Sequence, residues 1–308
     1  MRAIGGAVVM AGLLMGCSRQ KAEEPANEVG WDQVQRPAAG TSQSAAASAA
    51  TATTAAGAEL AGFDRNEYPG DSTMAAMHGE FAFTGYWLTN PPGETSNSWA
   101  GKRETLRAQG WGFLVLANGR LDHEILKAQK QGTSPAALGR KDAAQAVAAA
   151  QREGFPAGAI LFLDQEEGGR LLTEQAAYLL AWTEAVAATP YKPGVYASGQ
   201  PVPDDENITT IDDIRARVKA QHLHAVAMFS AQDQCPPAPG CTLQTKPLAA
   251  SGETDLIAWQ YAQSPRRPEI TQACGQTYAA DGNCYAPGFG KVYLDMDVAA
   301  SGDPSRGR

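Results

Sequence analysis

Three acidic residues, Asp164, Glu166 and Glu167, follow directly on an apolar run and precede a glycine pair. The apolar run is typical of a buried strand. Side chains two apart on a strand share a face, so Asp164 and Glu166 are expected to project together with Phe162. Neighbouring carboxylates move each other's pKa values apart, as an acid/base pair requires. The alternative is that these acids cap the following helix or pair with Arg170.

Further acids stand where other predicted strands end. Asp64 closes the first predicted strand, and Asp295 and Asp297 close the eighth. In a barrel of parallel strands these ends meet at one mouth, where such folds keep their active sites. The first and eighth strands would be neighbours, so Asp64 is expected close to Asp295. A ring of carboxylates is suited to acid/base cleavage of a sugar linkage.

Aromatic and amide side chains accompany these acids at the predicted strand ends. Flat rings suit the faces of sugars, and amides suit their hydroxyl groups. Core packing is the alternative for each single ring. The candidates for substrate binding are Tyr86, Tyr196, Trp259, Gln260, Tyr261 and Asp297.

The body of the chain alternates apolar strand-like runs with helical stretches. Strands are predicted at 62–64, 81–88, 112–117, 159–163, 194–197, 225–229, 256–261 and 292–297. Helices are predicted at 102–109, 141–152, 171–187 and 211–220. Repeated strand–helix units predict an α/β fold with a mostly parallel sheet. Eight strands in about 240 residues suit a (β/α)8 TIM-like barrel. A doubly wound sheet is the alternative, although no glycine fingerprint follows an early strand.

The composition excludes several classes of partner. Hydrophobic residues make up 44% and charged residues 19% of the chain, enough for a full core. The formal net charge of −8 argues against a nucleic-acid partner and against docking on an anionic membrane by charge. His222 and His224 share a predicted strand face, but no acid beside them completes a metal site. We expect no cofactor, no metal and a monomer.

The N-terminus has the layout of an export signal. Arg2 precedes an apolar stretch, residues 4–15, that is too short to span a bilayer. The run that ends at Cys17 resembles a bacterial lipobox, which implies cleavage before Cys17 and acylation of it. An ordinary signal peptide is the alternative. Ser18 follows the cysteine, and by the same resemblance this favours the outer membrane. We expect a protein anchored by lipid in the cell envelope, on the periplasmic face of the outer membrane.

Four regions are expected along the chain. Residues 1–17 form the signal, and residues 18–60 are rich in Ala, Ser and Thr, with no charge between 37 and 58. Such a segment cannot bury enough apolar surface to offset the entropy of ordering, so it is predicted to be a flexible tether. Residues 61–300 form the folded domain, and residues 301–308 are expected to be frayed.

The cysteines support export. With Cys17 used for lipid, an even number remains: Cys235, Cys241, Cys274 and Cys284. In an exported protein this suggests two disulfides. We predict that Cys235 pairs with Cys241 and Cys274 with Cys284, since each pair closes a short loop. Three pairings exist, and a zinc site is the competing interpretation, although the spacings do not suit it.

The order of the motifs resembles the family 25 glycoside hydrolases, the Chalaropsis-type lysozymes. It resembles more closely the glycoside-hydrolase-like domain of unknown function found in exported actinobacterial proteins. The motifs are Gly62-Phe63-Asp64, Leu163-Asp164-Gln165-Glu166, Gly194-Val195-Tyr196, Trp259-Gln260-Tyr261 and Leu294-Asp295-Met296-Asp297. The resemblance implies that Glu166 is the general acid and that Asp164 assists at the anomeric centre. It also implies that Asp64 and Asp295 support them, so we expect Glu166 protonated and Asp164 ionised.

The sequence also departs from the lysozymes. The first strand continues into the run 65–69, Arg-Asn-Glu-Tyr-Pro, and residues 86–99 look like an added loop at the mouth. The resemblance implies a glycosidase of the cell envelope that cuts an amino-sugar polymer, in the first place peptidoglycan. Its partner would be cell-wall glycan or another polysaccharide. The alternative is a catalytically inactive carbohydrate-binding or scaffold lipoprotein on the same barrel.

Overall fold

The computed structural model describes residues 59–308 except 203–206, 233–245, 265–283, 287 and 291. The chain divides into two units, Met1–Thr53 and Thr54–Arg308, and every described residue belongs to the second. The expected signal, the lipobox cysteine, nearly all of the tether and three further cysteines (Cys235, Cys241 and Cys274) lie outside the described residues. In the described part of the chain, no helix combines the length and the apolar character that crossing a membrane needs.

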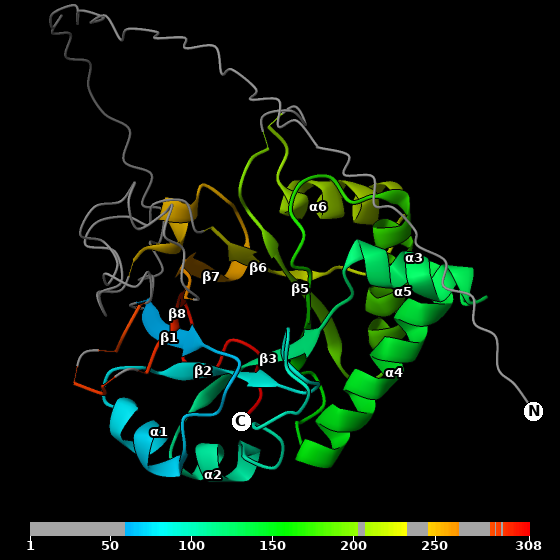
Figure 1. The fold of residues 1–308 in the computed structure, drawn as a ribbon. Helices are drawn as coiled ribbons and strands as arrows, with labels where there is room; N and C mark the ends of the chain where they lie inside the picture. The colour runs from blue at the N-terminus through cyan, green and yellow to red at the C-terminus, as the bar shows by residue number, and fades with distance from the viewer. Residues whose placement is uncertain (1–58, 203–206, 233–245, 265–283, 287, 291) are drawn as a thin grey trace, which may run out of the picture. The chain divides into compact units, whose positions relative to one another are not determined.

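Eight strands close into a barrel in chain order (Figure 1). They are β1 (Leu60–Asp64), β2 (Phe83–Trp87), β3 (Gly112–Asn118), β4 (Ile160–Asp164), β5 (Lys192–Ser198), β6 (Ala227–Ala231), β7 (Leu256–Ala262) and β8 (Asp295–Ala299). The described helices are α1 (Asp71–Met77), α2 (Arg103–Ala108), α3 (Asp122–Lys130), α4 (Pro135–Glu153), α5 (Thr173–Ala187), α6 (Thr210–Ala220) and the 3-10 helix η2 (Leu248–Ser251). The predicted α/β, TIM-like barrel is confirmed.

The direction of β8 differs from the prediction. We expected Asp295 and Asp297 at the end of a parallel strand, but β8 begins at Asp295 and runs antiparallel to both β1 and β7. The reversal places the first residue of β8 at the edge where the parallel strands end. Asp295 consequently pairs with Asp64 across the two backbones.

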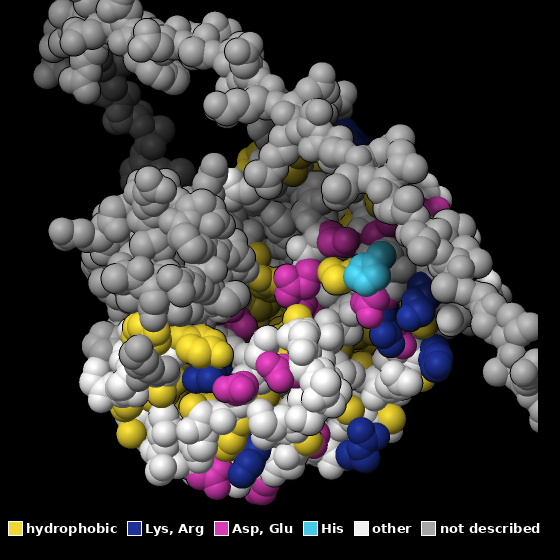
Figure 2. Space-filling model, in the orientation of Figure 1, with side chains coloured by type: hydrophobic (Ala, Val, Ile, Leu, Met, Phe, Trp, Pro, Cys, Tyr) yellow, Lys and Arg dark blue, Asp and Glu magenta, His cyan; other side chains and the backbone are white. Residues whose placement is uncertain are grey.

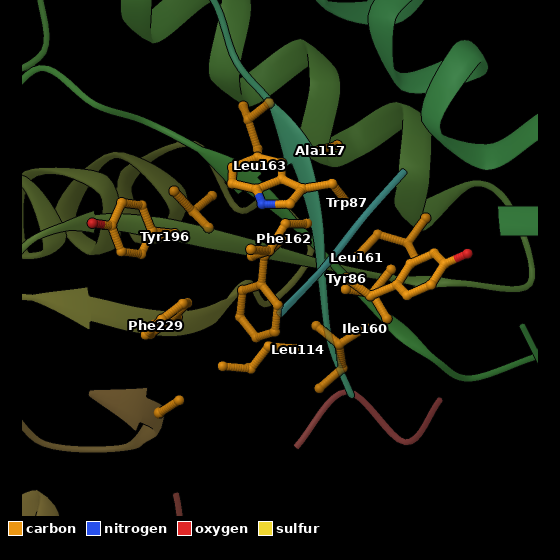
Figure 3. Close-up of a cluster of buried hydrophobic side chains, with 14 of the residues drawn as sticks. Tyr86, Trp87, Leu114, Ala117, Ile160, Leu161, Phe162, Leu163, Tyr196 and Phe229 are labelled. Atoms are coloured by element: carbon orange, nitrogen blue, oxygen red, sulfur yellow. The ribbon is translucent and has the colours of Figure 1, made fainter. Parts of the chain in front are cut away.

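Apolar side chains fill the barrel around β4, which is buried along its whole length. The rings of Phe162 and Phe229 meet edge to face with centroids 6.0 Å apart (Figure 3). Room for them comes from glycine on the neighbouring strand, because a Cβ at Gly194 would lie 2.5 Å from the Phe162 ring. This close packing fixes the height at which β4 delivers Asp164.

The long helix α4 begins six residues earlier than predicted. Ser134 accepts a hydrogen bond of 3.3 Å from the Ala137 amide, and Pro135 occupies the first turn, as N-terminal caps prefer. The helix ends at Glu153 and is capped by Gly154, whose φ of 77° is the left-handed conformation that glycine adopts without strain. At Gly139 a Cβ would lie 2.2 Å from the Tyr178 carbonyl oxygen, so α4 and α5 pack with backbones in close approach.

The C-terminal segment 301–308 is packed rather than frayed, which corrects our expectation. Ser305 is fully buried and bridges β3 and β4: its amide donates to the Phe113 carbonyl, and its own carbonyl accepts from the Ile160 amide, each at 2.8 Å. Its Oγ also accepts from the Val115 amide at 2.9 Å. Backbone groups make most of these bonds, so the small polar side chains gave no sign of them.

Cys284 is buried and takes part in a disulfide bond. The other four cysteines of the chain lie outside the described residues, so both predicted pairings stay predictions.

Candidate active site

A cavity of about 570 Å³ opens at the edge of the barrel where the parallel strands end. Four of the predicted acids line it: Asp64, Asp164, Glu166 and Asp295. They come from β1, from β4 and the loop after it, and from the start of β8. Acidic side chains gather around the hollow on this face (Figure 2). Barrel closure thus brings together carboxylates that are far apart in sequence.

Asp164 and Glu166 form a hydrogen-bonded pair with unequal surroundings. Asp164 is 3% exposed, whereas Glu166 is exposed at the mouth of the cavity. Burial and then the Glu166 and Asp64 charges raise the pKa of Asp164 well above its usual value, and the hydrogen bond to Glu166 raises it further. The neutral form of Asp164 is therefore favoured in these surroundings. This direction differs from our expectation of an ionised Asp164, because a strand end that excludes water disfavours a second negative charge.

Asp64 and Asp297 form a second pair deeper in the barrel. Burial is the main cause that raises the pKa of Asp64 to about 7, and the Glu166 charge adds to it. Asp297 is fully buried, and neither of its carboxyl oxygens accepts a hydrogen bond within the described residues. Burial and then the Asp64 and Asp295 charges raise the pKa of Asp297 well above its usual value. The dry interior therefore favours the neutral form of Asp297.

An amide and phenol network holds the Asp64 carboxylate from the side of β7. Gln260 Nε2 donates to Asp64 Oδ2 at 2.7 Å, and Gln260 Oε1 accepts from the Tyr196 hydroxyl at 2.8 Å. Gln263 Nε2 donates to the Tyr196 hydroxyl at 2.8 Å and to Gln260 Oε1 at 2.6 Å. This chain fixes the amide orientation of Gln260, so its donor side can only face Asp64.

A comparison with protein families identifies the domain. Residues 81–236 match the model of the Rv2525c-like, glycoside hydrolase-like domain. The chain belongs to the Rv2525c-like family of glycoside hydrolase-like domains. The matched residues include Asp164, Glu166 and Tyr196, whereas Asp64 and Asp295 reach the cavity of this Rv2525c-like domain from strands outside the match.

Solved structures with similarity to the Rv2525c-like domain are distant in sequence, and no curated protein matches the chain. An uncharacterised B. stearothermophilus protein is 20% identical, with 78% of this chain and 95% of that chain covered and a TM-score of 0.47. The Tat-secreted protein Rv2525c of Mycobacterium tuberculosis, in complex with HEPES, is 13% identical, with coverages of 79% and 94% and a TM-score of 0.43. The catalytic domain of endolysin ply40 from Listeria monocytogenes bacteriophage P40 is 13% identical, with coverages of 79% and 94% and a TM-score of 0.41.

Three aromatic side chains of this Rv2525c-like domain that we predicted to bind sugar lie away from the cavity. Tyr86 is fully buried outside the barrel, where its hydroxyl donates to Glu153 Oε2 at 2.5 Å (Figure 3). Trp259 and Tyr261 face away from Gln260 on β7, and their ring centroids lie 5.6 Å apart. All three rings are core packing, and neither they nor Asp297 are among the described residues that line the cavity. Tyr196 and Gln260 do line it.

The structure adds residues that sequence reasoning missed. Trp87, the chain neighbour of Tyr86, lines the cavity, together with Arg65, Gln263 and Tyr293. The structure shows why Trp87 points inward: Gly85, two residues earlier, lies on the same strand face, and a Cβ at Gly85 would lie 2.4 Å from the Asp64 Cβ. A glycine that must clear a site carboxylate marks the inward face of its strand, and hence its partners on that face.

We expected an added loop at residues 86–99, but its first two residues end β2. Within the rest of the range, Pro92, Gly93 and Glu94 line the cavity at its mouth. Asn66 Nδ2 donates to the Pro92 carbonyl at 2.9 Å, which ties the loop to the end of β1. Within the loop, Asn97 Nδ2 donates to the Trp87 carbonyl at 2.7 Å. The loop therefore forms a fixed wall of the cavity.

Glu167, the third acid after β4, has a structural role. Glu167 Oε2 accepts from the Asp122 amide at 2.7 Å and from Gln175 Nε2 at 2.5 Å. The carboxylate thus sits at the N-terminus of α3, where the helix dipole favours negative charge. The alternative that an acid of this motif caps a helix therefore applies to Glu167, but the capped helix is α3, which precedes it in the chain. The same contact anchors the loop that carries Glu166.

Among the described residues, no group of three or more His, Cys, Asp or Glu side chains could hold a metal ion. The His224 ring is exposed, and its Nδ1 lies 2.9 Å from Glu184 Oε2. This contact with Glu184 lies at the surface, and the described residues that line the cavity include neither side chain.

Proposed function

We propose that the chain is a glycoside hydrolase of the cell envelope that cuts an amino-sugar polymer, peptidoglycan, by carboxylate acid/base catalysis. One observation carries the proposal: a buried Asp164, whose pKa is raised, and an exposed Glu166 line one cavity in a glycoside hydrolase-like barrel. A strand end that only packs would not keep two coupled carboxyls beside open space, because their repulsion destabilises the fold.

In the proposed reaction the pair supplies one proton to the leaving oxygen. Glu166 is the member that meets the substrate, because it is exposed at the mouth. A bound sugar excludes water from Glu166, which favours transfer of the shared proton from Asp164 to Glu166. Glu166 then protonates the glycosidic oxygen as the bond to the anomeric carbon breaks. The Asp164 carboxylate, now ionised, stabilises the positive charge on that carbon. Water adds to this carbon, and its proton returns to the pair.

Asp64 and Asp295 have supporting roles in this proposal. The Gln260 amide holds the Asp64 carboxyl in place, and the Glu166 charge acts on that carboxyl. Asp295 Oδ1 accepts a hydrogen bond from the Ser264 amide, which fixes it at the start of β8. A 2-acetamido group on the substrate could itself attack the anomeric carbon, with Asp164 orienting it. Tyr196 and Gln260 are proposed to contact the sugar.

The proposed location is the periplasmic face of the outer membrane, with Cys17 acylated. The support is the lipobox-like run at residues 14–17 and the uncharged tether between it and the barrel. Metabolic labelling with a radioactive fatty acid should mark the wild type and not Cys17→Ser. Equal labelling of both would show that Cys17 is not the anchor.

The test of function is incubation of the purified chain with cell-wall glycan strands, with reducing ends and bound protein measured in parallel. The proposal expects new reducing ends. Binding of the strands without any release of reducing ends would instead show a catalytically inactive carbohydrate-binding protein.

A further inference from the structure

Arg65 is a cation in the wall of the cavity, directly after Asp64. Its side chain is only 7% exposed, and its guanidinium lies 4.6 Å from the centroid of the Tyr293 ring, which also lines the cavity. The backbone beneath it is fixed, since the Arg65 carbonyl accepts from Trp87 Nε1 at 3.1 Å. The group is therefore held in place at the site before any substrate binds.

The hydrogen-bonding capacity of Arg65 is largely unused. Guanidinium carries five donors in a planar fork, and a buried one is normally matched by acceptors. In the described part of the chain, the carboxylate paired with it is Glu67, at a distance of 3.5 Å and with 62% of its side chain exposed. The buried Nε has no acceptor among the described residues. Such a group carries a desolvation cost that a ligand with the right acceptor would relieve.

We infer that Arg65 binds a carboxylate on the substrate, so that the glycan taken by this site is an acidic one. A carboxylate matches the planar fork with two parallel hydrogen bonds, which sugar hydroxyl groups do not. Two chemical sources fit: the lactyl ether of a muramic acid and the carboxyl group of a uronic acid. The chain has a net charge of −8, and acids line the cavity, so an acidic glycan needs a local cation of this kind.

Glu67 competes with the substrate in this account. Its carboxylate is the one that a substrate carboxylate would displace, and its exposure makes it replaceable without loss of packing. Two neighbouring residues should therefore have effects of opposite sign. Removal of the guanidinium should weaken binding of acidic glycan, and removal of the Glu67 charge should strengthen it.

The test measures binding by calorimetry, with Glu166→Gln in every protein so that nothing is cleaved. The probes are peptide-free glycan strands with free lactyl carboxylates, the same strands with those groups reduced to alcohols, and an oligogalacturonate. We expect Arg65→Met to lose about 10- to 100-fold in affinity for the carboxylated strands and little for the reduced ones. Arg65→Lys should retain part of the affinity, Glu67→Gln should raise it, and Arg140→Met, an exposed arginine on α4, should leave it unchanged.

Preference for the oligogalacturonate over the strands would support the inference and assign the carboxylate to a uronic acid. Equal affinity of the parent protein for carboxylated and reduced strands would overturn it, as would weaker carboxylate binding in Glu67→Gln. The Glu67→Gln result keeps the test decisive should Arg65→Met not fold. The inference rests on the proposed function, but the two fail separately. A wild type that cleaves both strand types equally well refutes only the inference, and one that binds selectively without cleavage refutes only the function.

Discussion

Gln260 Nε2 donates a 2.7 Å hydrogen bond to Asp64 Oδ2 across β8, linking β7 to β1 at the floor of the cavity. The bond lowers the pKa of Asp64, while burial raises it to about 7 overall. Gln260 thus decides how readily the first carboxyl of the site ionises, and it does so from the last parallel strand. The same hydrogen bond therefore links two strands of the barrel and lowers the pKa of Asp64.

Replacing Gln260 should raise the pKa of Asp64 and weaken the fold. Gln260→Leu removes the donor to Asp64 and the acceptor for the Tyr196 hydroxyl, and both groups stay buried. We expect a loss of about 1–3 kcal/mol in the free energy of unfolding, because buried polar groups left without partners keep their desolvation cost. Urea unfolding would measure it, with the exposed Gln129→Leu on α3 as control. Equal stability of the two variants would contradict the network.

The protein should lose stability as the pH rises from about 4 to 7. Burial raises the pKa of Asp64, Asp164 and Asp297, so in this window the folded protein holds protons that the unfolded chain has released. As the pH rises, each such group lowers the free energy of unfolding by about 1.4 kcal/mol per pH unit. The contribution of Asp64 stops changing near pH 7, where its carboxyl in the folded protein also ionises. Unfolding midpoints at pH 5 and pH 8 would show this.

The matched variant for this prediction is Asp297→Asn. An amide is close in shape to the carboxyl but does not titrate, so the pH dependence should flatten and the stability at pH 8 should rise. Asp255→Asn, at an exposed site, should leave the slope unchanged. Stability that increases from pH 5 to pH 8 in the wild type would be incompatible with the protonated pairs.

A single methyl group on β2 should displace Asp64. In Gly85→Ala the new Cβ would lie 2.4 Å from the Asp64 Cβ and 3.1 Å from its Cα, so backbone must move. We expect a loss of about 1–3 kcal/mol in stability, as overpacking typically causes, and a loss of glycan cleavage. The control is Gly79→Ala, where a Cβ meets nothing within 4 Å. Cleavage by Gly85→Ala at the wild-type rate would mean that Asp64 does not need its present position.

The sequence predicted the structure well where a residue pattern favoured a single type of element. The apolar run before Asp164 favoured a buried strand, and on a strand the acid two residues beyond Phe162 points to the same side. The order of strands and helices then predicted a barrel, which brought Asp64 to the same mouth.

Other features had no unique pattern. All five residues of β2 are buried, so alternation could not tell the inward Trp87 from the outward Tyr86. The alternation of side chains along a strand is the same in both directions, so the sequence could not show that β8 runs antiparallel. Asp295 was therefore predicted at the correct edge of the barrel, but as the end of a strand and not as its start. The order of protonation depended on the burial of Asp164, and burial follows from tertiary packing.

The measurement that tests the central claim most directly is the rate at which reducing ends appear when glycan strands meet three proteins. These are the wild type, Glu166→Gln, and Glu80→Gln at an exposed site after α1. We predict that Glu80→Gln matches the wild type. Glu166→Gln should be slower by about 10²- to 10⁴-fold, because an amide cannot protonate the leaving oxygen. Equal rates for Glu166→Gln and the wild type would show that Glu166 is not the acid and would contradict the account.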